Sequence, residues 1–209
     1  MNQICVLHSG GIDSTAVLLW YLHKQKKEVI PLHIDYGQIN ESTEWERCLA
    51  IAKQLELTRP VKIEAGLKNL CSDHRIISGK KKTSSNDFLD HLAAEFFPNR
   101  NLYLLTLASV FCYKNHINTI ALGIIDGGTY SYTDTDLSFL RKVNSLFNHT
   151  LNITVEAPLI KWDKQKVIRF LNKNNFDVNL TYSCNTKSQT PCGKCAACQE
   201  RNIALKNVN

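Results

Sequence analysis

The chain has 209 residues, of which 44% are hydrophobic and 21% are charged, and its formal charge is +6. This composition is typical of a globular protein, and there is no apolar run near the roughly 20 residues of a membrane span and no leader-like N-terminus, so we expect a soluble, cytoplasmic protein. The positive charge fits a nucleotide-binding enzyme as well as a binder of polyanions, and by itself selects neither.

A glycine turn lies between the first predicted strand, residues 3–7, and the first predicted helix, residues 16–22. Such a turn directs several backbone N–H groups and the positive end of the helix toward one point, where a phosphate can bind. Asp13 in the turn is a candidate magnesium ligand. The candidates for phosphate binding are Ser9, Gly10, Gly11, Asp13, Ser14 and Thr15. The alternative is a plain glycine turn, and the missing Walker lysine excludes an ordinary P-loop.

The alternation of strands and helices continues after this turn. A second strand covers residues 28–34, and a helix begins near Ser42, where Thr43 and Glu46 have the spacing of a capping box. Further predicted elements are a strand at 61–63, a helix at 102–116, a strand at 119–123, a strand that runs into a loop at 151–159 and a helix at 164–172. This order predicts an α/β fold with a parallel sheet covered on both faces and ligands at the carboxyl ends of its strands.

Two regions depart from the α/β pattern. The pattern weakens between residues 66 and 100, where the basic segment 78–86 is predicted to be a solvated surface loop, with a substrate lid or a nucleic-acid contact as the alternatives. The alternation of strands and helices stops near residue 177. We therefore expect an ATP-binding α/β domain at 1–177 and a small metal-binding segment at 178–209 that packs on it.

Half of the eight cysteines crowd the C-terminal segment. The four are Cys184, Cys192, Cys195 and Cys198, and their Cys-x2-Cys spacing places thiolates on one side of a tight turn. Four thiolates suit a tetrahedral zinc ion with no open position, so the metal would be structural. An iron–sulfur cluster and free structural thiols are the alternatives, and a redox-active pair is disfavoured by the two further cysteines.

Several motifs together resemble one family. The loop at 9–15 resembles the PP-loop of the ATP pyrophosphatase superfamily, whose pattern is Ser-Gly-Gly-x-Asp-Ser. The further motifs are residues 35–38, 99–101 and 157–159, Lys164 and residues 191–198. In this order, and over nearly the full chain, they resemble the 7-cyano-7-deazaguanine synthase (QueC) family. The resemblance implies a doubly wound α/β fold of the adenine nucleotide alpha hydrolase type, followed by a zinc-binding segment.

The resemblance also implies a reaction. Members of the family use ATP to activate the carboxylate of 7-carboxy-7-deazaguanine as an acyl adenylate, ammonia then displaces AMP to give an amide, and a second activation dehydrates the amide to the nitrile. ATP, Mg²⁺ and structural Zn²⁺ are the expected cofactors. Asp13, Arg100 and Lys164 are the expected catalytic residues. Asp35, Gln38 and Gly123 are expected beside the nucleotide.

One segment departs from the family. Where the family has a sequence close to Gly-Tyr-Pro-Asp-Cys-Arg, this chain has residues 126–136, which keep Tyr132 and Asp134 but carry Asp136 in place of the arginine. Asp134 is predicted to accept from a guanine-like base and Tyr132 to stack on it. Drift in a loop and a change of substrate or nucleophile are both compatible with this difference.

Alternative functions stay open at this point. The acceptor can be ammonia or the amine of a partner protein, as in QueC-like proteins of bacterial defence systems. A PP-loop tRNA-modifying enzyme is a further alternative, although no RNA-binding domain is evident and no direct nucleic-acid partner is expected. A zinc-stabilised binding module without catalysis is disfavoured by the intact loop. Members of the family form dimers, so a homodimer is compatible with the resemblance.

Overall fold

The fold is built on a five-stranded parallel sheet with the strand order β3-β2-β1-β4-β5. The structure is a computed structural model, and it describes residues 3–67, 69–79, 88–125, 132–186 and 189–208. The strands are β1 (Gln3–Leu7), β2 (Glu28–Asp35), β3 (Val61–Glu64), β4 (Thr119–Ala121) and β5 (Thr154–Glu156). Val6 pairs with Pro31 on one side and with Ala121 on the other, so β1 is the central strand. The predicted fold class is confirmed.

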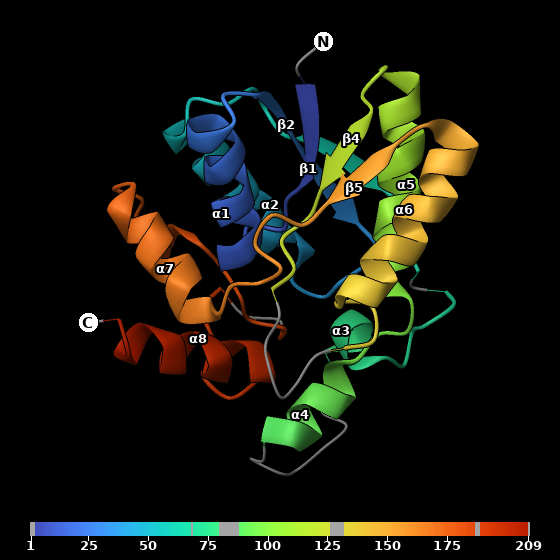
Figure 1. Cartoon of the computed structure of the whole chain (residues 1–209). Helices are drawn as coiled ribbons and strands as arrows, with labels where there is room; N and C mark the ends of the chain where they lie inside the picture. Colours follow the sequence, from blue (N-terminus) through green and yellow to red (C-terminus); the bar gives the residue numbers. More distant parts are fainter. Residues whose placement is uncertain (1–2, 68, 80–87, 126–131, 187–188, 209) are drawn as a thin grey trace.

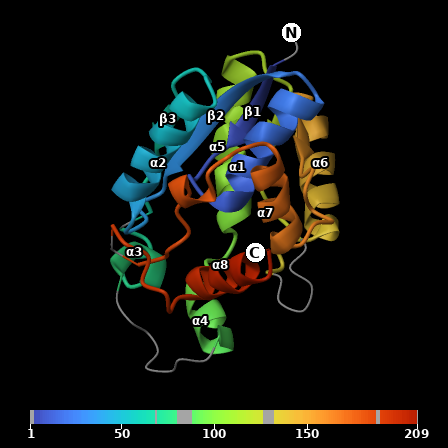
Figure 2. The ribbon, with the colours of Figure 1, turned by 90° about the vertical axis from the view of Figure 1, so that its left-hand side faces the viewer.

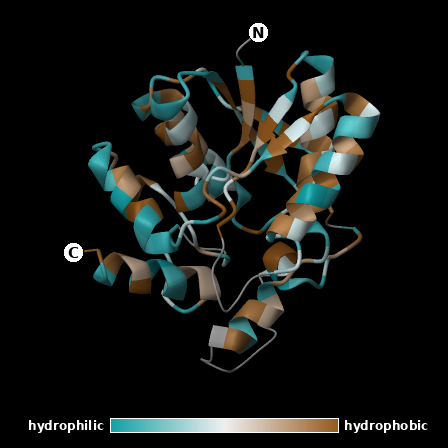
Figure 3. Ribbon diagram, viewed as in Figure 1, coloured by the Kyte–Doolittle hydropathy of each residue, from teal (hydrophilic) through white to brown (hydrophobic). Residues whose placement is uncertain are grey.

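Helices cover both faces of the sheet, as Figure 1 shows. They are α1 (Ile12–Leu19), α2 (Glu41–Gln54), α3 (Arg75–Ser78), α4 (Phe88–Glu95), α5 (Arg100–Lys114), α6 (Leu137–Leu151), α7 (Lys164–Lys173) and α8 (Ala196–Lys206). A π-helical turn, Trp20–Lys24, continues α1, and a 3-10 turn, Val178–Leu180, follows α7. Helices α1 and α7 cover one face and α5 and α6 the other, and apolar residues gather where they meet the sheet (Figure 3).

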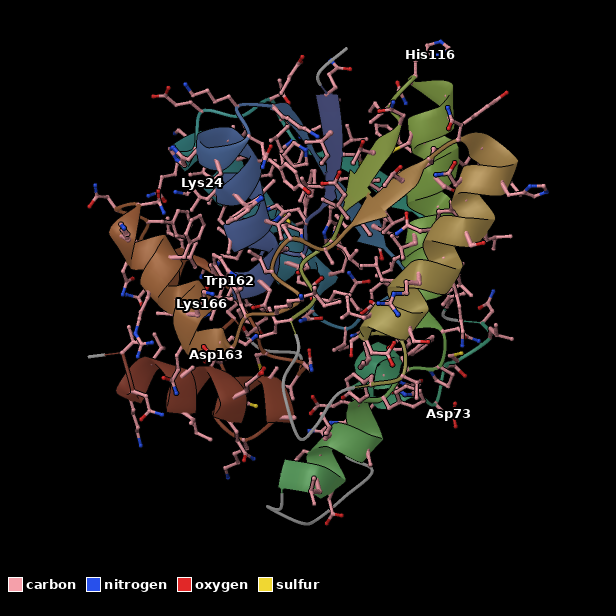
Figure 4. The ribbon with its side chains drawn as sticks, viewed as in Figure 1. Lys24, Asp73, His116, Trp162, Asp163 and Lys166 are labelled. Atoms are coloured by element: carbon pink, nitrogen blue, oxygen red, sulfur yellow. The ribbon has the colours of Figure 1, made fainter. Side chains whose placement is uncertain are left out.

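Three helices lie beyond the carboxyl ends of the strands. Figures 1 and 2 place α3, α4 and α8 at this end of the sheet, whereas His116, two residues after α5, marks the opposite end in Figure 4. The carboxyl end of a parallel sheet is where such folds bind ligands. Among the described residues, none of the helices combines the length and the apolar character that a membrane span requires.

The structure differs from the predicted elements in three places. Helix α6 was not predicted, although Leu140, Val143 and Phe147 have helical spacing. Helices α3, α4 and α8 lie in segments to which no element was assigned. The predicted capping box at Thr43 and Glu46 is wrong, because α2 already begins at Glu41 and Asn40 precedes it without a side-chain cap.

Candidate active site

The phosphate loop is a tight turn between β1 and α1. Gly10 has a φ of +74°, and a Cβ on it would lie 2.9 Å from the Cβ of Arg47, so both the conformation and the space require glycine. Gly11 is the N-cap residue of α1. The hydroxyl of Thr15 donates to the carbonyl of Gly11 at 2.7 Å. The amino end of α1, whose first N–H groups have no partner within the helix, lies beside the cavity described below.

The three predicted hydroxyl donors have different surroundings. Ser9 and Ser14 line the cavity, and the hydroxyl of Ser14 is 3.3 Å from the hydroxyl and 3.3 Å from the amide nitrogen of Ser9. Thr15 is fully buried, and its hydroxyl is engaged by Gly11. Ser9 and Ser14 therefore lie on the ligand side of the turn, whereas Thr15 does not line the cavity; the hydroxyls of Ser14 and Thr15 both contact the carbonyl of Gly11, at 3.2 and 2.7 Å.

Gly123 allows the end of β4 to approach the phosphate loop. A Cβ at this position would lie 2.6 Å from the nitrogen of Ser14 and 2.7 Å from the carbonyl carbon of Asp13. These are backbone atoms, which cannot turn away as a side chain can. Gly123 lines the cavity, and its missing side chain sets the distance between the sheet and the first turn of α1.

Asp13 and Lys164 form an ion pair across the cavity wall. The Nζ of Lys164 donates to Oδ2 of Asp13 at 2.6 Å and lies 3.3 Å from Oε2 of Glu200. Burial disfavours the charged amine, but the two carboxylates outweigh it and raise the pKa of Lys164, so it is a cation at neutral pH. Within the described residues, the buried Oδ1 of Asp13 has no hydrogen-bond partner.

Lys164 is held by the start of α7. The carboxylate of Asp163 accepts from the nitrogen of Lys166 at 2.6 Å and caps the helix. Just before the cap, the ring of Trp162 packs against Trp20 with 5.6 Å between centroids, which joins α7 to the end of α1. Figure 4 shows Trp162, Asp163 and Lys166 at this corner. The corner fixes Lys164 relative to the helix that carries Asp13.

The turn after β2 is locked by its own side chains. The carboxylate of Asp35 accepts from the nitrogen of Gly37 at 2.9 Å, and Asp35 is not among the residues that line the cavity. Gln38 does line it; its Oε1 accepts from the nitrogen of Tyr36 at 2.9 Å, and its Nε2 donates to Oε2 of Glu44 at 2.9 Å. Gln38 thus connects the turn to the first turns of α2.

The amino end of α5 brings Arg100 to the cavity. Burial opposes the charge of Arg100, but Tyr36, Asp134 and Tyr132 outweigh it and raise its pKa. The carboxylate of Asp134 accepts from the nitrogen of Asn101 at 3.1 Å, and the side chain of Asn101 donates back to the carbonyl of Asp134 at 2.9 Å. Asp134 therefore holds the start of α5 and is not among the cavity-lining residues.

Tyr132 does line the cavity. Its hydroxyl donates to the carbonyl of Leu92 in α4 at 3.0 Å, and its ring lies 5.3 Å from that of Phe96. Burial, and after it the charge of Glu95, raises the pKa of Tyr132 to about 12, so the phenol stays protonated. Residues 126–131 of the segment that departs from the family, and residues 80–86 of the basic segment, lie outside the described residues.

The four C-terminal cysteines converge. The sulfur atoms of Cys184, Cys192, Cys195 and Cys198 all lie within 4.8 Å of one another. Backbone amides donate to three of these sulfurs, for example from Cys192 to Cys184 at 3.3 Å and from Cys198 to Cys195 at 3.4 Å. Such amides stabilise thiolates. The four residues fit a tetrahedral metal with four sulfur ligands, which zinc and iron–sulfur clusters both accept.

The segment that carries these cysteines also forms part of the site. The nitrogen of Tyr182 donates to the carbonyl of Gly10 at 2.8 Å, and Asn40 donates to the carbonyl of Cys184 at 2.6 Å. From the other side, the buried carboxylate of Glu95 accepts from Asn185 at 2.7 Å and from the nitrogen of Ala196 at 3.3 Å. The cysteine cluster is therefore tied to the phosphate loop and to α4.

The phosphate loop, the Asp13–Lys164 pair, Arg100 and Tyr132 meet around one cavity of about 390 Å³ at the carboxyl ends of the strands, and the four cysteines lie outside its lining. Small-molecule sites are usually about 300–1,000 Å³. The predicted residues that line it are Ser9, Gly11, Asp13, Ser14, Gln38, Arg100, Gly123, Tyr132 and Lys164. Gly10, Thr15, Asp35 and Asp134 lie in the surrounding shell of hydrogen bonds and packing.

Sequence reasoning missed several residues of the cavity. Glu44 lines it, as do Glu95, His8 and His33. Burial, and next the nearby His33, lowers the pKa of His8 to about 3, so it is neutral. A signal for Glu44 was its place near the start of the helix that follows β2, because the first turn of that helix lies at the same sheet edge as the phosphate loop. Glu95 gave no local signal, since its hydrogen-bond donors Asn185 and Ala196 lie 90 and 101 residues away and its ion-pair partner Arg75 lies in another helix.

The chain is similar to known proteins over nearly its whole length. A family profile described as "Queuosine biosynthesis protein QueC" matches residues 3–209. The 7-cyano-7-deazaguanine synthase 1 of Desulfitobacterium hafniense is 33% identical over 98% of this chain and 92% of its own length. The 7-cyano-7-deazaguanine synthase of Buchnera aphidicola is 30% identical over 97% of this chain and 89% of its own length.

The fold also matches a solved structure. It is that of the U34-tRNA thiolase NcsA from Methanococcus maripaludis with its 4Fe-4S cluster, at a TM-score of 0.56 and 13% identity, over 99% of this chain and 67% of that one. At this identity the likeness concerns the fold alone. The profile and the relatives cover nearly the whole chain, and the chain therefore belongs to the QueC family.

Proposed function

We propose that this protein is an ATP-dependent carbon–nitrogen ligase that makes 7-cyano-7-deazaguanine. ATP activates the carboxylate of 7-carboxy-7-deazaguanine as an acyl adenylate, ammonia displaces AMP to give the amide, and a second activation gives the nitrile. The observation that carries the proposal is the convergence of the phosphate loop, the Asp13–Lys164 pair and Arg100 on one cavity. This cavity belongs to a chain whose relatives of similar length are named 7-cyano-7-deazaguanine synthases.

The residues suit the adenylation step. A carboxylate is a poor electrophile until its oxygen becomes a good leaving group, and transfer of AMP to it provides this. The N–H groups of the loop and the amino end of α1 would hold the pyrophosphate part of ATP. Lys164 and Arg100 are cations in a partly buried site, where they stabilise the negative charge that builds up as pyrophosphate leaves.

Asp13 fits the role of a magnesium ligand. Its Oδ1 is buried and has no partner among the described residues, whereas its Oδ2 is held by Lys164. A carboxylate oxygen of this kind is a ligand that Mg²⁺ accepts alongside substrate phosphates. When bound, the ion would neutralise phosphate charge and orient the leaving group.

For the cysteine cluster we propose zinc. Four thiolates leave no open position, so the ion would stabilise the C-terminal segment and would not activate water. The Cys-x2-Cys turn and its amide-to-sulfur hydrogen bonds support a metal bound by thiolates, and zinc is the proposed ion. Metal analysis and the visible absorption spectrum distinguish zinc, which is colourless, from a 4Fe-4S cluster, which is brown.

The substrate base would contact Tyr132. Its ring lines the cavity and can stack on a deazaguanine. For Asp134 the hydrogen bonds favour an indirect role, in which it holds α5 and through it Arg100. Gln38 is proposed to lie beside the nucleotide, and Asp35 to hold the turn that carries Gln38. The whole-length similarity to 7-cyano-7-deazaguanine synthases does not favour a protein acceptor or a tRNA-modifying activity.

The test is turnover with defined substrates. The purified protein is incubated with Mg²⁺, ATP and 7-carboxy-7-deazaguanine, with and without ammonium, and small molecules and intact protein are followed by mass spectrometry. We expect AMP, pyrophosphate and the nitrile when ammonium is present. A deazaguanine adduct on protein, or no carboxylate-dependent AMP, would contradict the proposal.

A further inference from the structure

Glu44 is a carboxylate of the cavity to which the proposed adenylation assigns no task. It lies in the first turns of α2, and its Oε2 accepts from the amide of Gln38 at 2.9 Å. Its backbone carbonyl is 3.0 Å from the point where a Cβ of Gly10 would lie, so it is adjacent to the phosphate loop. No ion pair of Glu44 is found among the described residues, unlike Asp13, which is paired with Lys164.

The surroundings of Glu44 favour a carboxylate that exchanges a proton near neutral pH. Burial raises the pKa of Glu44 to about 7, which the hydrogen bond from Gln38 and the charge of Arg100 only partly oppose. The titratable groups that face it are Arg100 from α5, Tyr36 from the turn after β2, and Glu41 and Cys48 from α2 itself. A base with a pKa near the working pH is the most effective one in proton transfer.

The proposed reaction needs such a base. Ammonium predominates over ammonia at neutral pH, and ammonium has no lone pair with which to attack. A half-buried anion that lines the cavity beside the phosphate loop, as Glu44 does, can bind the cation and remove one of its protons. A carboxylate that lies close to the phosphate loop and is not paired with a lysine suits this task, and Glu44 meets both conditions.

We propose that Glu44 binds ammonium and acts as its general base. One proton passes from ammonium to the carboxylate of Glu44, and the freed lone pair of ammonia attacks the acyl carbon of the adenylate. The bond from that carbon to the AMP oxygen breaks, and AMP leaves with the electron pair. The amide nitrogen then loses a second proton to solvent. This inference rests on the proposed function, because it needs an acyl adenylate and ammonia.

Glu44→Gln tests the proposal, with Glu46→Gln as the matched control. In the variant, glutamine keeps the shape of the side chain and the hydrogen bond from Gln38 but cannot take a proton. Glu46 serves as the control because it is exposed on the same helix. Carboxylate-dependent exchange of pyrophosphate into ATP, measured without ammonium, reports adenylation alone. Amide formation with ammonium reports the full step. Hydroxylamine, which is unprotonated at neutral pH, bypasses the need for a base and gives a hydroxamate.

We expect Glu44→Gln to keep pyrophosphate exchange and hydroxamate formation within about threefold of the unchanged protein. Its kcat/KM for ammonium should fall roughly 100-fold or more, the usual loss for a missing general base. In the unchanged protein this kcat/KM should rise with pH through an inflection near pH 7, as Glu44 loses its proton, and the variant should lack this inflection. The Glu46→Gln control should match the unchanged protein throughout.

Two results would overturn the inference. Unimpaired use of ammonium by Glu44→Gln would show that no base is needed there, and equal losses with ammonium and hydroxylamine would assign Glu44 to the adenylate or to folding. A failure of the proposed function looks different, because the unchanged protein itself would then show no carboxylate-dependent exchange.

Discussion

Replacing Gly123 by alanine tests how closely β4 must approach the phosphate loop. The added Cβ would lie 2.6 Å from the nitrogen of Ser14 and 2.7 Å from the carbonyl carbon of Asp13. Both are backbone atoms at the start of α1, so relief requires the sheet edge and the helix to move apart. Overpacking of this kind costs about 1–3 kcal/mol in the free energy of unfolding. For a chain of this size that is a fall of roughly 2–12 °C in Tm.

The displacement also falls on the residues that hold phosphate. We therefore expect Gly123→Ala to lower carboxylate-dependent pyrophosphate exchange by roughly 100-fold, because a shift of about 1 Å at a catalytic group has effects of this size. Thermal unfolding and the exchange assay measure the two effects. The control is Gly66→Ala, because a Cβ on Gly66 would have no neighbour within 4 Å. The reasoning fails if both variants behave like the unchanged protein.

Three further predictions concern other parts of the site. Burial lowers the pKa of His8 from 6.5 to about 3, so the unfolded chain binds the proton more strongly than the folded one. The free energy of unfolding should therefore fall by about 2 kcal/mol from pH 7 to pH 5. In urea titrations, His8→Asn should lack this part of the pH dependence. Lys164→Met should lower pyrophosphate exchange roughly 100-fold or more without changing the metal content. The control is Lys166→Met, two residues along α7 and over the ring of Trp162, which should leave the exchange unchanged. Equal effects of the two substitutions would show that Lys164 takes no part in the chemistry. Cys195→Ser should lose metal and solubility together in metal analysis, with Cys71→Ser as the control, and a soluble, fully loaded and active Cys195→Ser protein would refute a structural metal.

Local patterns were sufficient for the sheet and for the cysteine cluster. The strands β1 and β2 are short and largely apolar, β3 alternates apolar and charged residues, and their order along the chain between helices predicts a parallel sheet. The four cysteines are close in sequence, and a Cys-x2-Cys turn converges by local geometry alone. Helix α6 was also predictable, since Asp136 caps it and its buried residues have helical spacing.

The remaining features depend on contacts that are distant in sequence. Arg75 and Glu95 are both buried, and the carboxylate of Glu95 is satisfied by Asn185 and Ala196 from the cysteine segment. Polar residues at buried positions interrupt the apolar period of α3 and α4, so these helices gave no clear signal. Asp134 was predicted to accept hydrogen bonds from the substrate base. In the structure its carboxylate accepts from the nitrogen of Asn101, which is 33 residues away and cannot be identified from the sequence around Asp134. The division of the chain at residue 177 stays a prediction.

The most direct test of the proposed activity is a count of products with labelled ammonium. The protein is given Mg²⁺, an excess of ATP, 7-carboxy-7-deazaguanine and ¹⁵N-ammonium, and AMP and the deazaguanine products are quantified by mass spectrometry. We expect a nitrile that carries the ¹⁵N label, with two AMP released for each nitrile formed. An unlabelled product, a reaction that ends at the amide, or ATP cleaved to ADP would contradict the proposed synthase.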